Sequence, residues 1–296
     1  MLILISDAFD PSLPDRLAVL GEVTTDHDRL PEAEVVLVRS KTKCTREYID
    51  SAPDLKLIIR GGVGIDNIDK DYAETRGITV RNTPKASSVA VAELAFALML
   101  SVPNHIIKAA NGMQKGEWLK KEIKRTELFG KTLCLVGIGN IATEVAKRAA
   151  AFGMKVVAFD KYVSESKWAD MKASLDEAVA EADYISIHLP LTPETEGLVN
   201  AGVIAKCSKK PVVINTGRGD TVNAGDMKAA LEKGDVAFYA CDVYPSDPPA
   251  KDYPILHAPN TLLTPHIGAS SKENLLRIGD ETLAIIEEVM KGGNRS

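Results

Sequence analysis

The sequence has few cysteines, no long hydrophobic run and no basic cluster. Its four cysteines (Cys44, Cys134, Cys207 and Cys241) stand far apart without metal-ligand spacing, so we expect reduced, mostly buried thiols, no metal site and a cytoplasmic location. The longest apolar stretch, residues 89–102, is shorter than the roughly 20 residues that cross a bilayer. The amino terminus lacks the basic residues of a signal peptide. We therefore expect neither a membrane protein nor a secreted one.

The charge balance is mildly acidic, since 36 Lys and Arg residues against 41 Asp and Glu residues give a net charge of -5. A broad nucleic-acid surface needs many cations to replace phosphate counterions, so we do not expect one here. The lysines within residues 112–130 fit a solvated connection. With 296 residues and no internal repeat, the chain has the length of about two domains.

Short runs rich in β-branched residues alternate with helical patterns along nearly the whole chain. The predicted strands form a first series (2–6, 34–38, 55–59, 78–80) and a second series (132–137, 155–159, 184–188, 211–215, 236–240, 261–264). Strands that alternate with helices predict right-handed crossovers and mainly parallel sheets. The fold class is therefore α/β.

A dinucleotide-binding motif opens the second series. Gly137, Gly139 and Ala142 form a GxGxxA pattern directly after a predicted strand and at the start of an Ala-rich helix. The glycines permit a tight turn and the approach of a pyrophosphate, and the small third residue allows close helix packing. Asp160 ends the next strand, about 20 residues on, where an acid binds the ribose and repels a 2′-phosphate. The pattern predicts NAD as cofactor, although Lys161 places a cation beside that acid.

Three polar residues follow strands of the second series, at the sheet edge where open α/β sheets bind ligands. Hydride transfer from a hydroxy acid needs a base for the hydroxyl proton, a cation for the carboxylate, and a carboxylate that orients the base. His266, Arg218 and Asp247 fill these roles in that order. Each residue also has a structural alternative. His266 could cap a neighbouring element or pack in the core, Arg218 could form an ion pair with Asp220, and Asp247 could be present because Asp suits the SDPP turn.

Two segments of the first series carry arginines directly after strands. Arg60 begins the RGGVG segment (60–64), whose glycines can leave backbone N–H groups open to an anion. The alternative is a purely structural turn. The predicted substrate-binding residues are Arg39, Ser40, Arg60, Gly61, Gly62, Val63, Gly64 and Arg218.

The domain order follows from the position of the cofactor motif, which begins only with the second series. The last helical pattern, residues 271–290, repeats apolar residues at helical spacing and could return to the first domain. We predict a substrate-binding domain of residues 1–98 plus 272–296 and an NAD-binding domain of residues 99–271.

Several ordered segments carry a resemblance to a known family. They are VRSKTKCT (38–45), RGGVGIDNID (60–69), NTPKASSVAVAEL (82–94), GKTLCLVGIGNIATEVAKRAAAFGMKVVAFD (130–160), HLPLTPETEGLVN (188–200), NTGRGD (215–220) and TPHIGASS (264–271). On these segments the chain resembles the D-isomer-specific 2-hydroxyacid dehydrogenase family over nearly its whole length. Within the family it most resembles the phosphoglycerate dehydrogenases.

This resemblance implies two Rossmann-like lobes, each a mainly parallel sheet flanked by helices, with the active cleft between them. It implies Arg218 as the substrate-binding arginine and His266 as the acid/base, with Asp247 where the family usually has Glu. A homodimer is usual in the family, built around the long helix near Val89 and the neighbouring loops. The predicted cofactor contacts are Ser87, Gly137, Gly139, Asn140, Ile141, Asp160, His188, Leu189, Pro190, Thr195, Thr216, Gly217, Arg218, Asp242, His266 and Gly268.

The implied activity is NAD-dependent oxidation of 3-phospho-D-glycerate to 3-phosphooxypyruvate, the first step of the phosphorylated route to serine, without a carboxy-terminal regulatory domain. Reduction of glyoxylate or hydroxypyruvate, or oxidation of D-glycerate, would use the same catalytic residues and stays open. Arg39 and Arg60 favour the phosphorylated substrate. A non-catalytic, NAD-sensing protein of the corepressor type shares the fold, but the presence of all three catalytic residues argues against it.

Overall fold

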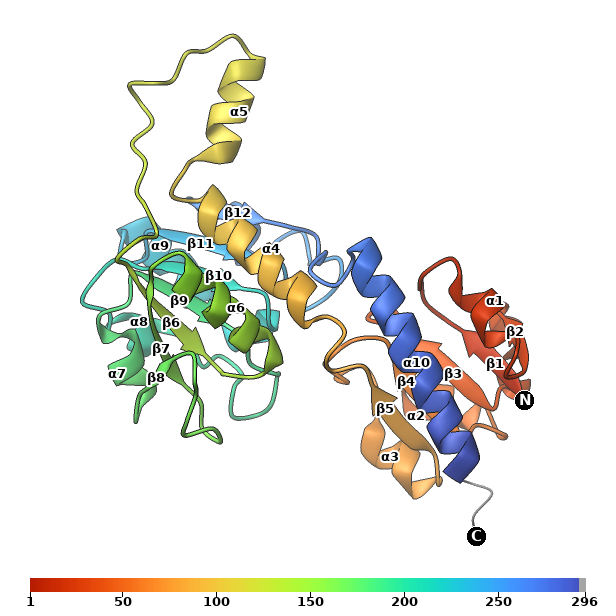
Figure 1. The fold of residues 1–296 in the computed structure, drawn as a ribbon. Helices are drawn as coiled ribbons and strands as arrows, with labels where there is room; N and C mark the ends of the chain where they lie inside the picture. The colour runs from red at the N-terminus through yellow and green to blue at the C-terminus, as the bar shows by residue number, and fades with distance from the viewer. Residues whose placement is uncertain (293–296) are drawn as a thin grey trace. The chain divides into compact units, whose positions relative to one another are not determined.

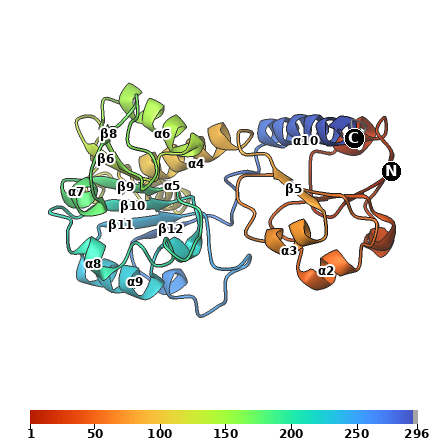
Figure 2. The same cartoon turned by 90° about the horizontal axis from the view of Figure 1, so that it is seen from below.

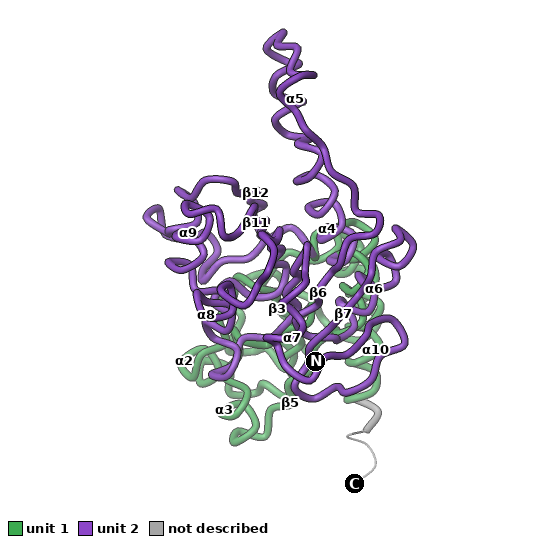
Figure 3. Tube along the Cα trace, turned by 90° about the vertical axis from the view of Figure 1, so that its left-hand side faces the viewer, with its two compact units in different colours: residues 1–90, 269–296 green, residues 91–268 purple. Residues whose placement is uncertain are grey.

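The computed structural model describes residues 1–292 as two compact units (Figure 3). Unit 1 comprises residues 1–90 and the segment from residue 269 onward, and unit 2 comprises residues 91–268. Both boundaries fall earlier in the chain than those we predicted. The reason at the first boundary is that Ala92 and the residues after it pack in the core of unit 2. Residues 293–296 of the predicted substrate-binding domain lie outside the described residues.

Unit 1 is built on a parallel sheet with the strand order β2-β1-β3-β4-β5 (Figure 1). Its strands are β1 (Leu2–Ile5), β2 (Glu22–Thr24), β3 (Val35–Val38), β4 (Leu57–Arg60) and β5 (Thr79–Asn82). Pairs such as Ile3↔Val35 set the register. The chain leaves β1 toward β2 on one side and reaches β3 on the other. The order therefore reverses between β1 and β3, and a sheet of this kind binds ligands beyond the strand ends at that point.

Helices cover both faces of this sheet, which explains why its three inner strands, β1, β3 and β4, are almost wholly apolar. On one face α1 (Leu13–Leu17) and α10 (Lys272–Gly292) pack on alternate residues of β1, β3 and β4. On the other face lie α2 (Arg46–Asp50) and α3 (Lys70–Thr75) (Figure 2). The helix at the carboxy-terminal end thus joins a core formed by the first 60 residues, as its helical pattern suggested.

Unit 2 contains a seven-stranded parallel sheet with the order β12-β11-β10-β9-β6-β7-β8. The strands are β6 (Thr132–Val136), β7 (Lys155–Phe159), β8 (Asp170–Met171), β9 (Tyr184–Ile187), β10 (Val212–Asn215), β11 (Phe238–Cys241) and β12 (Thr261–Leu263). The order reverses between β6 and β9, so the loops after these two strands flank the expected ligand position.

The two faces of this sheet are covered by different helices (Figure 2). Helices α4 (Ser88–Ser101) and α6 (Asn140–Ala151) pack on one face through small residues such as Ala92 and Ala146. The other face is covered by α7 (Leu175–Ala180), α8 (Ala201–Ile204) and α9 (Ala224–Lys233). Short 3-10 helices are η1 (His27–Glu32) in unit 1 and η2 (Gly219–Thr221) and η3 (Pro254–His257) in unit 2.

Helix α5 (Ile106–Gln114) leads away from the sheet of unit 2, and the polar segment 115–127 returns beside it (Figure 1). Within the described residues no single helix has the length and apolar character to cross a membrane; α4 and α5, bent by 66°, meet that test only as a pair. The four cysteines are free, and all but Cys207 are buried, which confirms the expected thiols. The cytoplasmic location stays a prediction.

Two strands are absent from the sequence-based prediction. Both β2 and β8 are short, occupy sheet edges and have no fully buried residue. An edge strand of this kind needs no apolar run, so its sequence carries no strand pattern.

Candidate active site

The turn after β6 leaves open space beside the backbone of Gly139. Gly137 has φ of 90°, and a Cβ there would lie 3.0 Å from the carbonyl oxygen of His188. Gly139 is the N-cap of α6, and a Cβ there would meet nothing within 4 Å. Ala142 is fully buried against the sheet. A helix start beside open space suits a pyrophosphate.

Asp160 holds the same turn from the end of β7. Its Oδ2 accepts the N–H of Ile138 at 2.9 Å, and its Oδ1 accepts those of Tyr162 and Val163 at 2.9 and 3.2 Å. A carboxylate has about four acceptor positions, so one is left for a ribose hydroxyl. The neighbouring Lys161 pairs with Glu194 at 2.7 Å, which weakens its attraction for a 2′-phosphate. Both observations favour NAD.

Two buried polar atoms at the ends of β9 and β10 have no hydrogen-bond partner among the described residues: His188 Nδ1 and Thr216 Oγ1. The other ring nitrogen of His188 bonds Ser186 Oγ at 2.8 Å. Burial lowers the pKa of His188 to about 4, so the ring is neutral at pH 7. Buried polar atoms are nearly always satisfied, so these two mark places that a ligand can complete. The residues present therefore fit a bound dinucleotide.

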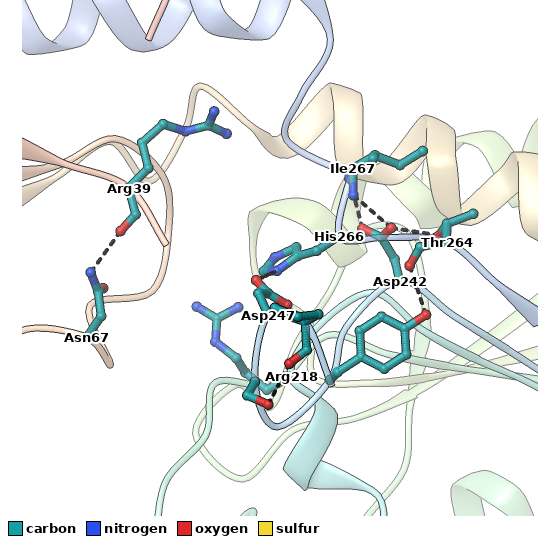
Figure 4. Close-up of polar contacts among 12 residues, drawn as sticks. Arg39, Asn67, Arg218, Asp242, Asp247, Thr264, His266 and Ile267 are labelled. Carbon is teal, nitrogen blue, oxygen red and sulfur yellow. Dashed lines mark hydrogen bonds and ion pairs between the residues drawn. The ribbon is translucent and has the colours of Figure 1, made fainter. Parts of the chain in front are cut away.

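His266 and Asp247 form a pair in the loops after β12 and β11. Asp247 Oδ2 lies 2.5 Å from His266 Nδ1 (Figure 4). Because a carboxylate only accepts hydrogen bonds, Nδ1 carries a proton and Nε2 is the nitrogen left to take one up. Asp in place of the family's usual Glu thus still reaches the imidazole. The pair can bind a proton and stabilise the resulting charge.

The turn that carries His266 is fixed by the buried Asp242. Its carboxylate accepts the Thr264 hydroxyl at 2.6 Å and the N–H groups of Ile267 and Gly268 at 2.9 and 2.8 Å (Figure 4). His266 itself has φ of 53°, a left-handed conformation that a non-glycine residue adopts only when its surroundings enforce it. The three charge-assisted hydrogen bonds to Asp242, made by residues on both sides of His266, hold it in this conformation.

Arg218 is presented by a loop that Asn215 organises. Asn215 is fully buried; its Nδ2 donates to the Arg218 carbonyl at 2.9 Å, and its Oδ1 accepts the Gly217 N–H at 3.0 Å. Figure 4 shows Arg218 gathered with Asp247 and His266. The structure therefore brings the three predicted catalytic residues together at one edge of the sheet of unit 2.

In unit 1 the loop after β3 is held from two sides. Asp7, directly after β1, accepts the N–H of Arg39 at 2.5 Å and both the N–H and the hydroxyl of Thr42 at 3.2 and 2.8 Å. Asn67 donates to the carbonyl of Arg39 at 2.8 Å (Figure 4) and to that of Thr42 at 2.6 Å. The loop presents Ser40 and the exposed Lys41 and Lys43 beside the point where the strand order reverses.

The guanidinium of Arg39 donates to two backbone carbonyls, those of Ala8 at 3.2 Å and Ala269 at 3.1 Å. Burial lowers the pKa of Arg39, and the charge of Asp7 opposes that shift. The Arg39 side chain thus has a structural role, since it connects the segments of Ala8 and Ala269, and the sequence did not suggest this role.

The glycine segment after β4 differs from the prediction that its backbone N–H groups are open to an anion. The N–H of Gly61 donates to the Val38 carbonyl at 2.8 Å and that of Gly62 to the Arg60 carbonyl at 2.9 Å, so neither is open to an anion. Gly62 has φ of 148°, and a Cβ there would lie 1.6 Å from Arg60 Nη1. Gly62 thus lets the Arg60 side chain lie against the backbone, whereas a Cβ at Gly61 would meet the ring of Phe9 at 2.5 Å. Val63 and Gly64 stay predicted contacts.

Every predicted cofactor contact except Ser87 lies in unit 2, after the ends of its strands. Asn140 and Ile141 follow β6; Leu189, Pro190 and Thr195 follow β9; Thr216 and Gly217 follow β10; Asp242 follows β11; His266 and Gly268 follow β12. Ser87 is buried in unit 1. The anchoring residues Asp7 and Asn67 were missed. Asp7 could have been found, since it follows the first predicted strand.

Comparison with known proteins decides the family. The family model for the D-isomer specific 2-hydroxyacid dehydrogenase, NAD binding domain, matches residues 96–268. The chain belongs to this family. Residues 96–268 of this dehydrogenase form its NAD-binding domain, and the parallel sheets flanked by helices are the fold we predicted.

Two relatives and one solved structure are especially similar. A hydroxypyruvate reductase of Thermotoga maritima is 42% identical, over 91% of this chain and 90% of that protein. A D-3-phosphoglycerate dehydrogenase of Methanocaldococcus jannaschii is 40% identical over 96% of this chain, which spans only 57% of that relative's length. The D-lactate dehydrogenase of Aquifex aeolicus, solved with NAD and lactic acid, superposes with a TM-score of 0.87 at 29% identity, covering 99% of this chain and 96% of that one.

Proposed function

We propose that this dehydrogenase oxidises 3-phospho-D-glycerate to 3-phosphooxypyruvate, the reaction that opens the phosphorylated route to serine. NAD, when bound, accepts the hydride. His266 Nε2 takes the hydroxyl proton, and Asp247 stabilises the imidazolium that forms. Arg218 binds the carboxylate and polarises the developing carbonyl. Arg39 and Arg60 of unit 1, with their neighbouring residues, bind the rest of the substrate.

The observation that carries the choice of substrate is the number of cations on the loop after β3 and at the end of β4 in unit 1. Arg39, Lys41 and Lys43 lie on the loop after β3, and Arg60 ends the neighbouring strand β4. A phosphate adds about -1.5 to -2 charges to the carboxylate at neutral pH. Four cations exceed what a single carboxylate requires, and they match a substrate with two anionic ends.

D-glycerate, or its oxidation product hydroxypyruvate, is the second candidate. The full-length relative from Thermotoga maritima is named hydroxypyruvate reductase. In addition, Arg39 already donates to two backbone carbonyls, which leaves fewer of its N–H groups for a phosphate. Both observations favour an unphosphorylated substrate, and the catalytic chemistry of unit 2 would be unchanged.

Initial rates of NADH formation with 3-phospho-D-glycerate and with D-glycerate, under matched conditions, separate the two candidates. We expect a preference for the phosphorylated acid in kcat/KM. The double change Lys41→Gln and Lys43→Gln should reduce that preference, whereas Lys120→Gln, on the segment after α5, should not. A preference for D-glycerate, unaffected by the two loop lysines, would overturn the proposal.

We also propose that the dehydrogenase is a homodimer that uses α5 and the segment after it. Ile106, Ile107, Met113 and Trp118 are each more than half exposed on this projection. Exposed apolar side chains of this density mark interaction surfaces, and a second copy is the partner usual in the family. The molecular mass in solution should therefore fall by half on Trp118→Ser combined with Met113→Ser. Val19→Ser, an exposed control in unit 1, should leave the mass unchanged; an unaltered mass in the double variant would contradict the proposed surface.

A further inference from the structure

Asn274, near the start of α10, is fully buried and binds two distant segments of unit 1. Its Nδ2 donates to the carbonyl of Ala269 at 2.8 Å and to the hydroxyl of Ser87 at 3.2 Å. Because a carbonyl only accepts hydrogen bonds, the amide nitrogen and not the oxygen must face Ala269. Ser87 is buried as well. One side chain thus joins residues that are far apart in the sequence.

These two segments are the ones through which the chain passes between its units. The first passage lies between residues 90 and 91, shortly after Ser87, and the second lies between residues 268 and 269, directly before Ala269. The second passage also follows the His266 turn by two residues. Asn274 therefore fixes, from within unit 1, the ends of both connections to the unit that carries the catalytic residues.

The carbonyl of Ala269 accepts a second hydrogen bond, from Nη2 of Arg39 at 3.1 Å. Arg39 lies on the cationic loop after β3, whose backbone Asp7 and Asn67 hold. A continuous chain of hydrogen bonds therefore runs from the candidate substrate loop through Ala269 and Asn274 to Ser87. All four residues lie in unit 1.

We propose that Asn274 is a positioning residue that holds both connecting segments together, and that an anionic substrate at Arg39 tightens this junction. The second half of the proposal rests on the proposed function, because it assigns Arg39 to the substrate. An anion that orders the Arg39 guanidinium increases the fraction of time in which the hydrogen bond from Arg39 to the Ala269 carbonyl is formed. Because Asn274 binds the same carbonyl and Ser87, the segment around Ser87 also becomes less mobile.

Hydrogen exchange measured on the intact protein tests the junction without any need for turnover. In Asn274→Leu, which keeps the size but removes the donors, we expect faster exchange both in peptides covering residues 84–91 and in peptides covering 268–274. We expect kcat to fall about tenfold, because small misplacements of catalytic groups are costly. The dissociation constant for NAD should stay within about twofold, since every predicted cofactor contact except Ser87 lies in unit 2.

Thr282→Val is the matched control, because Thr282 is another fully buried polar side chain of α10 and its hydroxyl has no partner among the described residues. Thr282→Val should change neither the hydrogen exchange of the two peptides nor kcat. If Asn274→Leu does not fold, Ser87→Ala, which removes one branch, decides by the exchange of the two peptides alone, because Ser87 is also a predicted cofactor contact. Wild-type exchange in both peptides, or a change confined to α10, would overturn the role of Asn274.

The contribution of substrate is tested by adding 3-phospho-D-glycerate or D-glycerate in the absence of NAD. Either acid should slow exchange of both peptides in the wild-type protein, and the effect on residues 84–91 should vanish in Asn274→Leu. Slowing that persists in the variant would refute the transmission through Asn274. A wild-type protein that oxidises neither acid would refute the proposed function, while the ligand-free exchange of Asn274→Leu would still decide the junction.

Discussion

In unit 2 the residues after β10, β11 and β12 are held by the buried side chains Asn215 and Asp242, whereas in unit 1 the loop after β3 is held by Asp7 and Asn67. Both sheets therefore place a short polar anchor under a functional loop. The loops differ in content. Unit 2 presents a histidine–aspartate pair with one arginine, and unit 1 presents arginines and lysines without a proton-transfer pair.

The difference indicates a division of labour between the two sheets. Proton transfer needs fixed geometry. His266 meets that need, because its left-handed backbone conformation is held by three hydrogen bonds from neighbouring residues to Asp242. Recognition of an anion depends more on charge and tolerates side chains on an exposed loop. Changes in the loops of unit 2 that carry Arg218, Asp247 and His266 should therefore act mainly on kcat or NAD affinity, and changes in the cationic loop after β3 of unit 1 mainly on the KM for the acid.

The largest expected effect is that of His266→Asn. The amide can still donate to Asp247 but cannot take up the proton, so we expect kcat to fall about 10³-fold. The dissociation constant for NAD, measured by fluorescence titration, should change little. His257→Asn, an exposed histidine of the same unit that bonds the Lys251 carbonyl, is the control. Substantial turnover in His266→Asn would mean that another group of the protein is the base.

The glycine turn of unit 2 allows cofactor binding to be separated from stability. A Cβ at Gly139 meets nothing within 4 Å in the protein but takes up the room for a pyrophosphate. Gly139→Ala should therefore weaken NAD binding about 10- to 100-fold, which corresponds to about 1–3 kcal/mol of overpacking. The melting temperature should not change. Gly137→Ala, by contrast, forces a side chain into φ of 90° and should destabilise the protein by about 1–2 kcal/mol. Equal losses of stability in the two variants would contradict this separation.

An intermediate effect is expected from Asp7→Asn in unit 1. The amide loses one of the two acceptor oxygens that hold Arg39 and Thr42, so the cationic loop is less fixed. Steady-state kinetics should show a rise of about tenfold in the KM for the acid, the cost of about one charge-assisted bond, with kcat and NAD affinity nearly unchanged. Asp10→Asn, whose carboxylate bonds Ser12 instead, is the control. A fall in kcat without a change in KM would break the division of labour.

An effect confined to acidic pH, with none at neutral pH, concerns stability and His188. Its pKa in the folded protein, about 4, lies below the ordinary value of 6.5, so the unfolded chain binds the proton first as the pH falls. The stabilisation by the neutral ring is complete above about pH 6.5 and is lost between there and pH 4, by at most about 3 kcal/mol. His188→Gln should therefore show a shallower decline of the melting temperature over this window. The exposed His27→Gln should keep the wild-type slope, and identical slopes in all three proteins would contradict the burial argument.

The sequence was sufficient to predict the two parallel sheets and that Arg218, Asp247 and His266 lie together, because buried parallel strands are apolar throughout and ligands lie at strand ends. It was insufficient for the anchors. Asp242 was expected to touch the cofactor, but its three bonds to Thr264, Ile267 and Gly268 depend on how loops more than 20 residues apart meet. Likewise, nothing in the RGGVG pattern shows that Gly61 and Gly62 use their N–H groups within the protein.

The return of α10 to unit 1 has a consequence for biosynthesis. On the ribosome, residues 1–90 emerge first, but one face of their sheet, around Ile3 and Leu57, stays without Ile285 and Ile286 until nearly two hundred further residues have been made. Unit 2 is continuous from residue 91 to 268 and can complete its own core during that interval. The unit that begins first in translation is thus the one whose core is completed last, and in the meantime one apolar face of its sheet stays uncovered.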